Sequence, residues 1–96
     1  MEIRKTVEGD KATLAIEGWL DTQTAPELGA AIDALGDDVA QLEFDFEKLE
    51  YVSSAGIRQI VAAHKKMGGK LVVRDASPAV LEVFQLTGVD KRLIIV

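Results

Sequence analysis

The sequence predicts an α/β fold, in which a mixed and mostly parallel sheet of five strands packs against three or more helices. Strand-like and helix-like segments follow one another in the order β-β-α-β-α-β-α-β, and a short Gly-Asp turn joins the first two strands. A tight turn makes an antiparallel pair, whereas strands separated by one helix lie parallel with right-handed crossovers. The 96 residues contain no linker and no repeat, so we expect a single domain over residues 1–96.

The first two predicted strands cover residues 2–8 and 12–17, on either side of Gly9-Asp10. Apolar side chains occupy every second position of the later strand, which is the period of a strand with one buried face. We therefore expect these strands to form the antiparallel hairpin of the sheet.

The first helix is predicted from an apolar stripe with helical spacing, formed by Leu28, Ala31, Ile32 and Leu35. Thr24 and Glu27 have the spacing of a capping box, in which each side chain satisfies a backbone N–H of the first turn. We expect Gly36 to end this helix. The later elements are predicted to be a strand at 42–46, a helix at 55–67, a strand at 70–74, a helix from Ser77-Pro78 to Gly88, and a strand at 93–96.

Composition and charge disfavour several classes of protein. Sixteen acidic residues against eleven basic ones leave a net charge of −5, which makes nucleic acid a poor partner. No apolar run approaches the roughly 20 residues that cross a bilayer, and the first residues lack the apolar segment of a secretion leader. Cysteine is absent. We therefore expect a cytoplasmic protein that binds neither nucleic acid nor membrane, with a monomer as its default state.

Catalytic constellations are also missing from the sequence. His64 and Ser54 are ten helical residues apart, or about 15 Å, which is too far for a nucleophile and its base. We find no Gly-rich phosphate loop, no metal-ligand cluster and no pair of catalytic carboxylates. We therefore expect no enzymatic activity, no metal and no cofactor, and we expect His64 to be a packed or rim side chain.

Three stretches of the chain resemble one protein family, in the same order. Gly18–Leu28 is similar to that family's Gly-x-Leu-Asp segment, and Phe44–Arg58 is similar to its strand, loop and helix start. Val83–Val89 is similar to the end of its third helix. Together these stretches resemble STAS domains, and the length resembles the free-standing bacterial anti-sigma factor antagonists.

The resemblance implies a mechanism of partner switching. An unphosphorylated antagonist binds an anti-sigma factor, often a serine kinase of the GHKL type, and so releases a sigma factor. The kinase phosphorylates a serine at the start of the second helix, and a phosphatase of the PP2C type removes the phosphate. The register against Gly56 makes Ser54 that serine. The resemblance implies a partner-binding surface of Asp21, Asp45, Ser53, Ser54, Ala55, Gly56 and Arg58.

The chain departs from the family at this serine. Many members read Asp-Ser-Ser-Gly where this chain reads Ser53-Ser54-Ala55-Gly56, which leaves Ser53 as a rival acceptor. A serine directly before a helix is also an N-cap, and capping alone would explain Ser54. Alternatively, the helix N-terminus accommodates a phosphate that brings about −1.5 to −2 charges. Such a phosphate would repel an acidic or tightly fitted partner. Carboxylates at the same edge of the sheet would add to this repulsion, and the candidates are Asp21, Asp45, Glu47 and Glu50.

The sequence allows more than one interpretation for several residues and for the function. Asp21 is either an interface residue or a turn residue at the helix entry, and Asp45 either an interface residue or a cap of the following loop. Ala55 and Gly56 are small enough to let a partner approach closely. Trp19 is either an exposed anchor or, as we expect, a half-buried packing residue. The alternative functions are a STAS scaffold subunit of a signalling or lipid-transport complex without a phospho-switch, and a small-ligand or nucleotide sensor.

Overall fold

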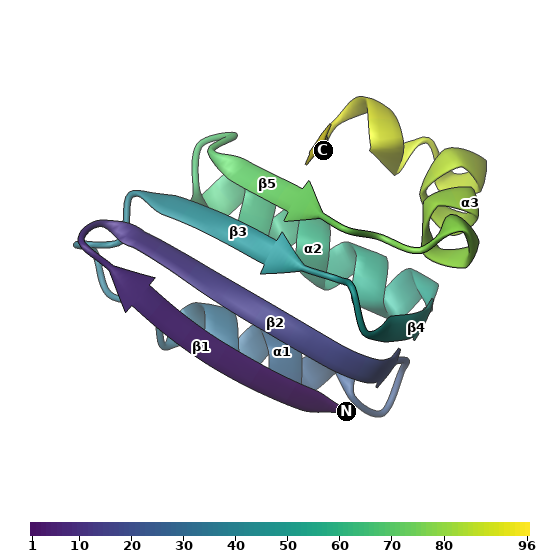
Figure 1. The fold of residues 1–96 in the computed structure, drawn as a ribbon, viewed down its shortest axis with the longest axis horizontal. Coiled ribbons are helices and arrows are strands. Elements are labelled where there is room, and N and C mark those ends of the chain that lie inside the picture. Colours follow the sequence, from purple (N-terminus) through teal and green to yellow (C-terminus); the bar gives the residue numbers. More distant parts are fainter.

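Six strands form the sheet of this protein, and helices α1 and α2 lie behind it on the same face (Figure 1). The computed structural model describes residues 1–96 throughout. No helix has the length and apolar character needed to cross a bilayer. The elements are β1 (Glu2–Glu8), β2 (Lys11–Leu20), α1 (Ala25–Asp33), β3 (Gln41–Asp45), β4 (Leu49–Val52), α2 (Ser54–Lys66), β5 (Leu71–Arg74), α3 (Pro78–Thr87), the 3-10 helix η1 (Val89–Lys91) and β6 (Ile94–Ile95).

The predicted α/β class and the mixed sheet are confirmed. β1 and β2 are antiparallel, and they are the only antiparallel pair. β2 pairs in parallel with β3, β3 with β5, and β5 with β6. The short turn at Gly9 therefore sets the direction of the first pair, and the helices between the other strands set the rest.

The expected five strands are one too few, because residues 49–52 form an additional strand, β4. It pairs with the last residues of β2, beyond the point where β3 stops. The register shifts between Gly18 and Trp19, so that Trp19 pairs with Tyr51 and Glu50 is left over. This bulge interrupts the alternation of buried and exposed side chains. The order is therefore β-β-α-β-β-α-β-α-β.

The core lies between the sheet and the helices and contains 23 buried side chains. Phe46, in the turn between β3 and β4, joins two parts of this core. Its ring centroid lies 5.3 Å from that of Phe44 and 6.3 Å from that of Phe84 on α3. Phe46 thus packs α3 against the end of the sheet at which the chain turns toward α2.

Helix α3 begins and ends where predicted, whereas the capping box predicted for α1 is wrong. Ser77 Oγ accepts a hydrogen bond from Val80 N–H at 3.2 Å, and Gly88 ends α3 with a φ of 75°. Thr24 already has helical backbone angles and makes no side-chain cap. Its own N–H donates instead to Asp21 Oδ1, three residues earlier.

Candidate functional site

The two adjacent serines at the start of α2 have different roles. Ser53 is the N-cap, with an extended backbone (φ −93°, ψ 172°), and its Oγ accepts a hydrogen bond from Gly56 N–H at 3.3 Å. Ser54 is the first helical residue; its side chain is exposed and its hydroxyl makes no hydrogen bond to the protein. The interpretation of Ser54 as the N-cap is therefore wrong, because α2 begins at Ser54 and not at residue 55.

Asp21 lies beside these serines at the carboxyl end of β2. The Ser53 N–H donates to Leu20 O at 2.8 Å, which joins the end of β2 to the start of α2. Asp21 Oδ1 accepts from the N–H groups of Gln23 and Thr24, both at 3.0 Å. These bonds form the turn that leads into α1, so the role of Asp21 as a helix-entry residue is confirmed.

The hydrogen bonds to Asp21 also keep its side chain charged. The pKa of Asp21 lies below its ordinary value because the backbone N–H of Thr24 donates to the carboxylate. The Gln23 N–H lowers the pKa further. The negative charge of Asp21 thus lies one residue after Leu20, whose carbonyl accepts the hydrogen bond from Ser53 N–H.

Asp45 caps a loop and lies farther from the serines than expected. Its Oδ1 accepts from Glu47 N–H at 3.1 Å, and its Oδ2 lies 3.9 Å from Arg74 Nη2. Asp45 pairs with Ala15 of β2, whereas Val52 pairs with Leu20. Five strand residues correspond to about 17 Å, so the structure does not bring Asp45 to the start of α2.

The three remaining predicted residues lie on different sides of α2. Gly56 is buried, and a Cβ there would lie 2.6 Å from Leu20 Cγ and 3.0 Å from Val52 Cγ2. The explanation that Gly56 is small to admit a partner is therefore wrong, because the strands already fill that space. Ala55 is partly buried, and Arg58 is exposed without an ion pair. Arg58 follows Ser54 by one helical turn, on the same face.

Two exposed aromatic side chains lie next to this surface. Trp19 is 56% exposed and Tyr51 is 42% exposed, and their ring centroids are 5.2 Å apart with an angle of 40° between the planes. Leu20 and Val52, the next residues of the two strands, are buried, so the aromatic pair lies on the face without helices. Trp19 is thus more exposed than expected, although it packs against Tyr51. Tyr51 was missed because the bulge hides its pairing.

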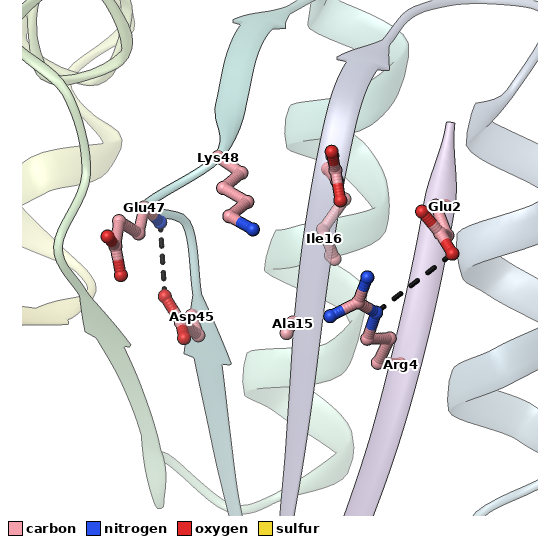
Figure 2. Close-up of a pocket in the computed structure, with 8 residues that line it drawn as sticks. Glu2, Arg4, Ala15, Ile16, Asp45, Glu47 and Lys48 are labelled. Atoms are coloured by element: carbon pink, nitrogen blue, oxygen red, sulfur yellow. Dashed lines mark hydrogen bonds and ion pairs between the residues drawn. The ribbon is translucent and has the colours of Figure 1, made fainter.

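A hollow of about 230 Å³ lies on the helix-free face, where β3 and β4 separate beside β2. Figure 2 shows the side chains that line it. Its charged lining consists of four carboxylates, from Glu2, Glu17, Asp45 and Glu47, and two cations, from Arg4 and Lys48. The excess of carboxylates disfavours a nucleotide phosphate there. This hollow therefore does not support a nucleotide sensor.

The polar groups elsewhere form no catalytic pair. His64 is partly buried on α2, ten residues after Ser54, and its Nδ1 has no hydrogen-bond partner. Asp45, Glu47 and Asp75 bring carboxylate oxygens within 4.8 Å of one another at the surface. Exposed acidic groups of this kind are common, and nothing else marks this cluster as a metal site.

Comparison with known proteins places this fold and its sequence in one family. The family model described as "Mlab, STAS domain" (STAS_2) matches residues 3–96. A putative anti-sigma factor antagonist of Bordetella bronchiseptica, BtrV, is 31% identical over 77 residues, which cover 76% of this chain and 66% of that protein. The match thus spans slightly less than two thirds of that relative.

Solved structures agree with this placement. An anti-sigma factor antagonist from Mycobacterium paratuberculosis superposes with a TM-score of 0.86 at 27% identity, covering 98% of this chain and 83% of that one. The phosphorylated form of the Bacillus protein SpoIIAA has a TM-score of 0.75 at 19% identity, covering 99% and 91%. Its unphosphorylated form has a TM-score of 0.76 at 18% identity, covering 99% and 87%.

These matches cover nearly the whole chain, including the segments that form the end of β2, the strand β4 and the start of α2. They agree with a surface that offers groups for binding but no catalytic constellation. The chain belongs to the STAS domain family.

Proposed function

We propose that this protein is an anti-sigma factor antagonist that binds its partner through the carboxyl ends of β2 and β4 and the first turn of α2. The similarity to the mycobacterial antagonist, which extends over 98% of the chain, supports this class of partner. The observation that carries the proposal is the exposed Ser54, whose hydroxyl is free at the first position of a helix.

Phosphorylation of Ser54 is the switch in this proposal. Ser53 is the less suitable acceptor because its Oγ is partly buried and holds the first turn of α2. A phosphate on Ser54 is compatible with the helix, because the unpaired N–H groups and the dipole favour an anion there. The kinase would be the partner itself, a GHKL-type serine kinase, and a PP2C-type phosphatase would reverse the reaction.

In this proposal, Arg58 makes the switch electrostatic, because it can pair either with an acidic group of the partner or with the phosphate. It is exposed and unpaired one turn after Ser54, so it is available to an acidic group of the partner while Ser54 is unmodified. A phosphate at Ser54 would pair with Arg58 within the same helix and repel that acidic group. Binding would end without any change in the fold.

The test is to incubate the purified protein with the product of a neighbouring kinase gene and Mg-ATP, and to map the phosphate by mass spectrometry. We expect modification at Ser54 in the wild type and in Ser53→Ala, and none in Ser54→Ala. Ser53→Ala is the matched control, because it removes a neighbouring hydroxyl from the same turn. Phosphate on Ser53, or on neither serine, would contradict the switch.

The second candidate is a scaffold subunit of a signalling or lipid-transport complex without a phospho-switch. The absence of the family's aspartate at Ser53 and of its second serine at Ala55 favours it. A scaffold would keep its partner when Ser54 is replaced by aspartate, whereas a switched antagonist would release it. Pull-down of interacting proteins with Ser54→Ala and Ser54→Asp therefore separates these two functions. In both cases we expect a monomeric cytoplasmic protein when no partner is present.

A further inference from the structure

Trp19 and Tyr51 are the two aromatic members of the exposed large hydrophobic side chains, which also include Val7, Leu86, Ile94 and Val96. Each aromatic side chain lies across the β2–β4 pairing from the other, and the bulge at Gly18 aligns them. The backbone of Trp19 is held in place, because the Thr24 hydroxyl lies 2.8 Å from Trp19 O. The two rings therefore project from paired strands and not from a loop, and we call them the platform.

The two segments that contain the platform carry more acidic than basic side chains, and the amino terminus of Met1 lies beside Gly18. These segments, residues 15–24 and 46–54, carry four carboxylates and a single basic residue, Lys48. Asp21 is among the carboxylates. Glu50, the extra residue of the bulge, is exposed directly beside Tyr51.

We infer that the Trp19–Tyr51 platform, with the carboxylates around it, binds an arginine side chain within a basic segment of the protein's partner. The face of an indole or phenol ring attracts a cation, and arginine is the most frequent such cation because its planar group stacks on the ring. The carboxylates add charge complementarity to the ring contact. This inference rests on the proposed function, since it describes the chemistry of the partner at the same end of the sheet.

Charge complementarity also disfavours other occupants. A second copy of this protein also has a net charge of −5 and the same carboxylates beside its platform, so the two copies would repel each other. Nucleic acids and anionic lipid surfaces would meet the same repulsion. A basic protein segment is the occupant that both the rings and the carboxylates attract.

The test uses a short capped peptide of alternating arginine and glycine as the probe, and the same peptide with citrulline, which keeps the shape of arginine without its charge. Trp19 is the only tryptophan, so its fluorescence reports on this site. We expect saturable binding of the arginine peptide and binding about tenfold weaker for the citrulline peptide. NMR chemical shifts follow binding in variants that lack Trp19.

Two pairs of variants separate ring chemistry from apolar bulk. Trp19→Phe and Tyr51→Phe keep aromatic rings and should keep most of the binding. Trp19→Leu and Tyr51→Leu keep apolar bulk and should weaken binding about fivefold to tenfold. Circular dichroism checks that each variant is folded. Equal binding by the leucine variants, equal binding of the two peptides, or no saturable binding at all would overturn the inference. Concentration-dependent dimers that the leucine variants abolish would also overturn the inference, because a second copy would then be the occupant of the platform.

Failure of the platform and failure of the proposed function give different results. If the kinase never modifies Ser54 while the peptide still binds in the way described, the switch fails and the platform stands. If Ser54 is modified and the leucine variants bind the peptide as well as the wild type, the platform fails and the switch stands.

Discussion

At the scale of single residues, the start of α2 divides two tasks between neighbouring serines. The Ser53 hydroxyl holds the helix, whereas the Ser54 hydroxyl is free. We expect Ser53→Ala to lower the free energy of unfolding by about 1 kcal/mol, the usual cost of a lost N-cap. Ser54→Ala should change it by far less, because it removes no protein hydrogen bond. Urea denaturation of both variants checks this, and equal losses would contradict the assignment.

Asp21 should make stability depend on pH in the acidic range. Its pKa in the folded protein lies below the ordinary value of 3.8, because the Thr24 and Gln23 N–H groups favour the carboxylate. Its contribution to stability is therefore complete above the ordinary value and is lost as the pH falls through the lower folded-state pKa. We expect Asp21→Asn to be less stable than the wild type at neutral pH, and the difference to shrink in that acidic range.

The measurement for Asp21 is the denaturation midpoint of the two proteins over a series of pH values. Asparagine keeps the oxygen that accepts from the N–H groups, so the comparison isolates the charge. A difference that stays constant down to the lowest pH would show that the charge of Asp21 does not stabilise the turn.

At the scale of elements, two helical glycines look alike in sequence and differ in their neighbours. A Cβ at Gly56 would meet the buried Leu20 side chain at 2.6 Å, whereas a Cβ at Gly29 would meet Gln59 Oε1 at 2.8 Å. Leucine in the core cannot move aside, but the end of a glutamine side chain can. We expect Gly56→Ala to destabilise by about 1 to 3 kcal/mol. Gly29→Ala should be neutral or stabilise by up to about 1 kcal/mol.

Thermal unfolding of these two alanine variants provides the comparison. They introduce the same methyl group into neighbouring helices, so helix propensity acts in the same direction in both. If Gly56→Ala were as stable as Gly29→Ala, the close packing of α2 on the end of β2 would not constrain this position. The positioning of Ser54 beside Asp21 would then need another explanation.

Local sequence patterns predict some elements of this fold and not others. Alternation along β2 and the stripes of the helices predicted these elements, because each depends on a local period. The strand β4 has no such period, because the bulge leaves Glu50 without a partner on β2. The predicted capping box of α1 is wrong for a similar reason. Asp21 Oδ1 accepts from the N–H groups of Gln23 and Thr24, and Thr24 itself makes no side-chain cap.

At the scale of the whole molecule, the switch should change binding and leave the fold intact. Ser54 is exposed at a helix N-terminus, so the negative charge of Ser54→Asp is compatible with the helix. We expect the NMR spectrum of this variant to change only near α2, with a thermal midpoint close to that of the wild type. Its affinity for the anti-sigma partner, measured by calorimetry, should fall at least about tenfold.

Arg58→Gln supplies the control for this prediction. It removes the cation that we assign to the partner's acidic group, so it should weaken binding even when Ser54 is unmodified. Unfolding of Ser54→Asp under the same conditions, or unchanged affinity in both variants, would contradict a surface electrostatic switch.

The sequence alone determined the fold class, the antiparallel first pair, the ends of α3 and the family, because these depend on local periods, turn residues and motif order. It also located the serine pair to within one residue. The tertiary structure decided which serine is free, that Gly56 packs against strands, and that Asp45 lies far from Ser54. It also placed Tyr51 beside Trp19. These findings depend on how the strands pair and where α2 begins, and the pairing of Trp19 with Tyr51 follows from a bulge that appears only when β2 and β4 meet.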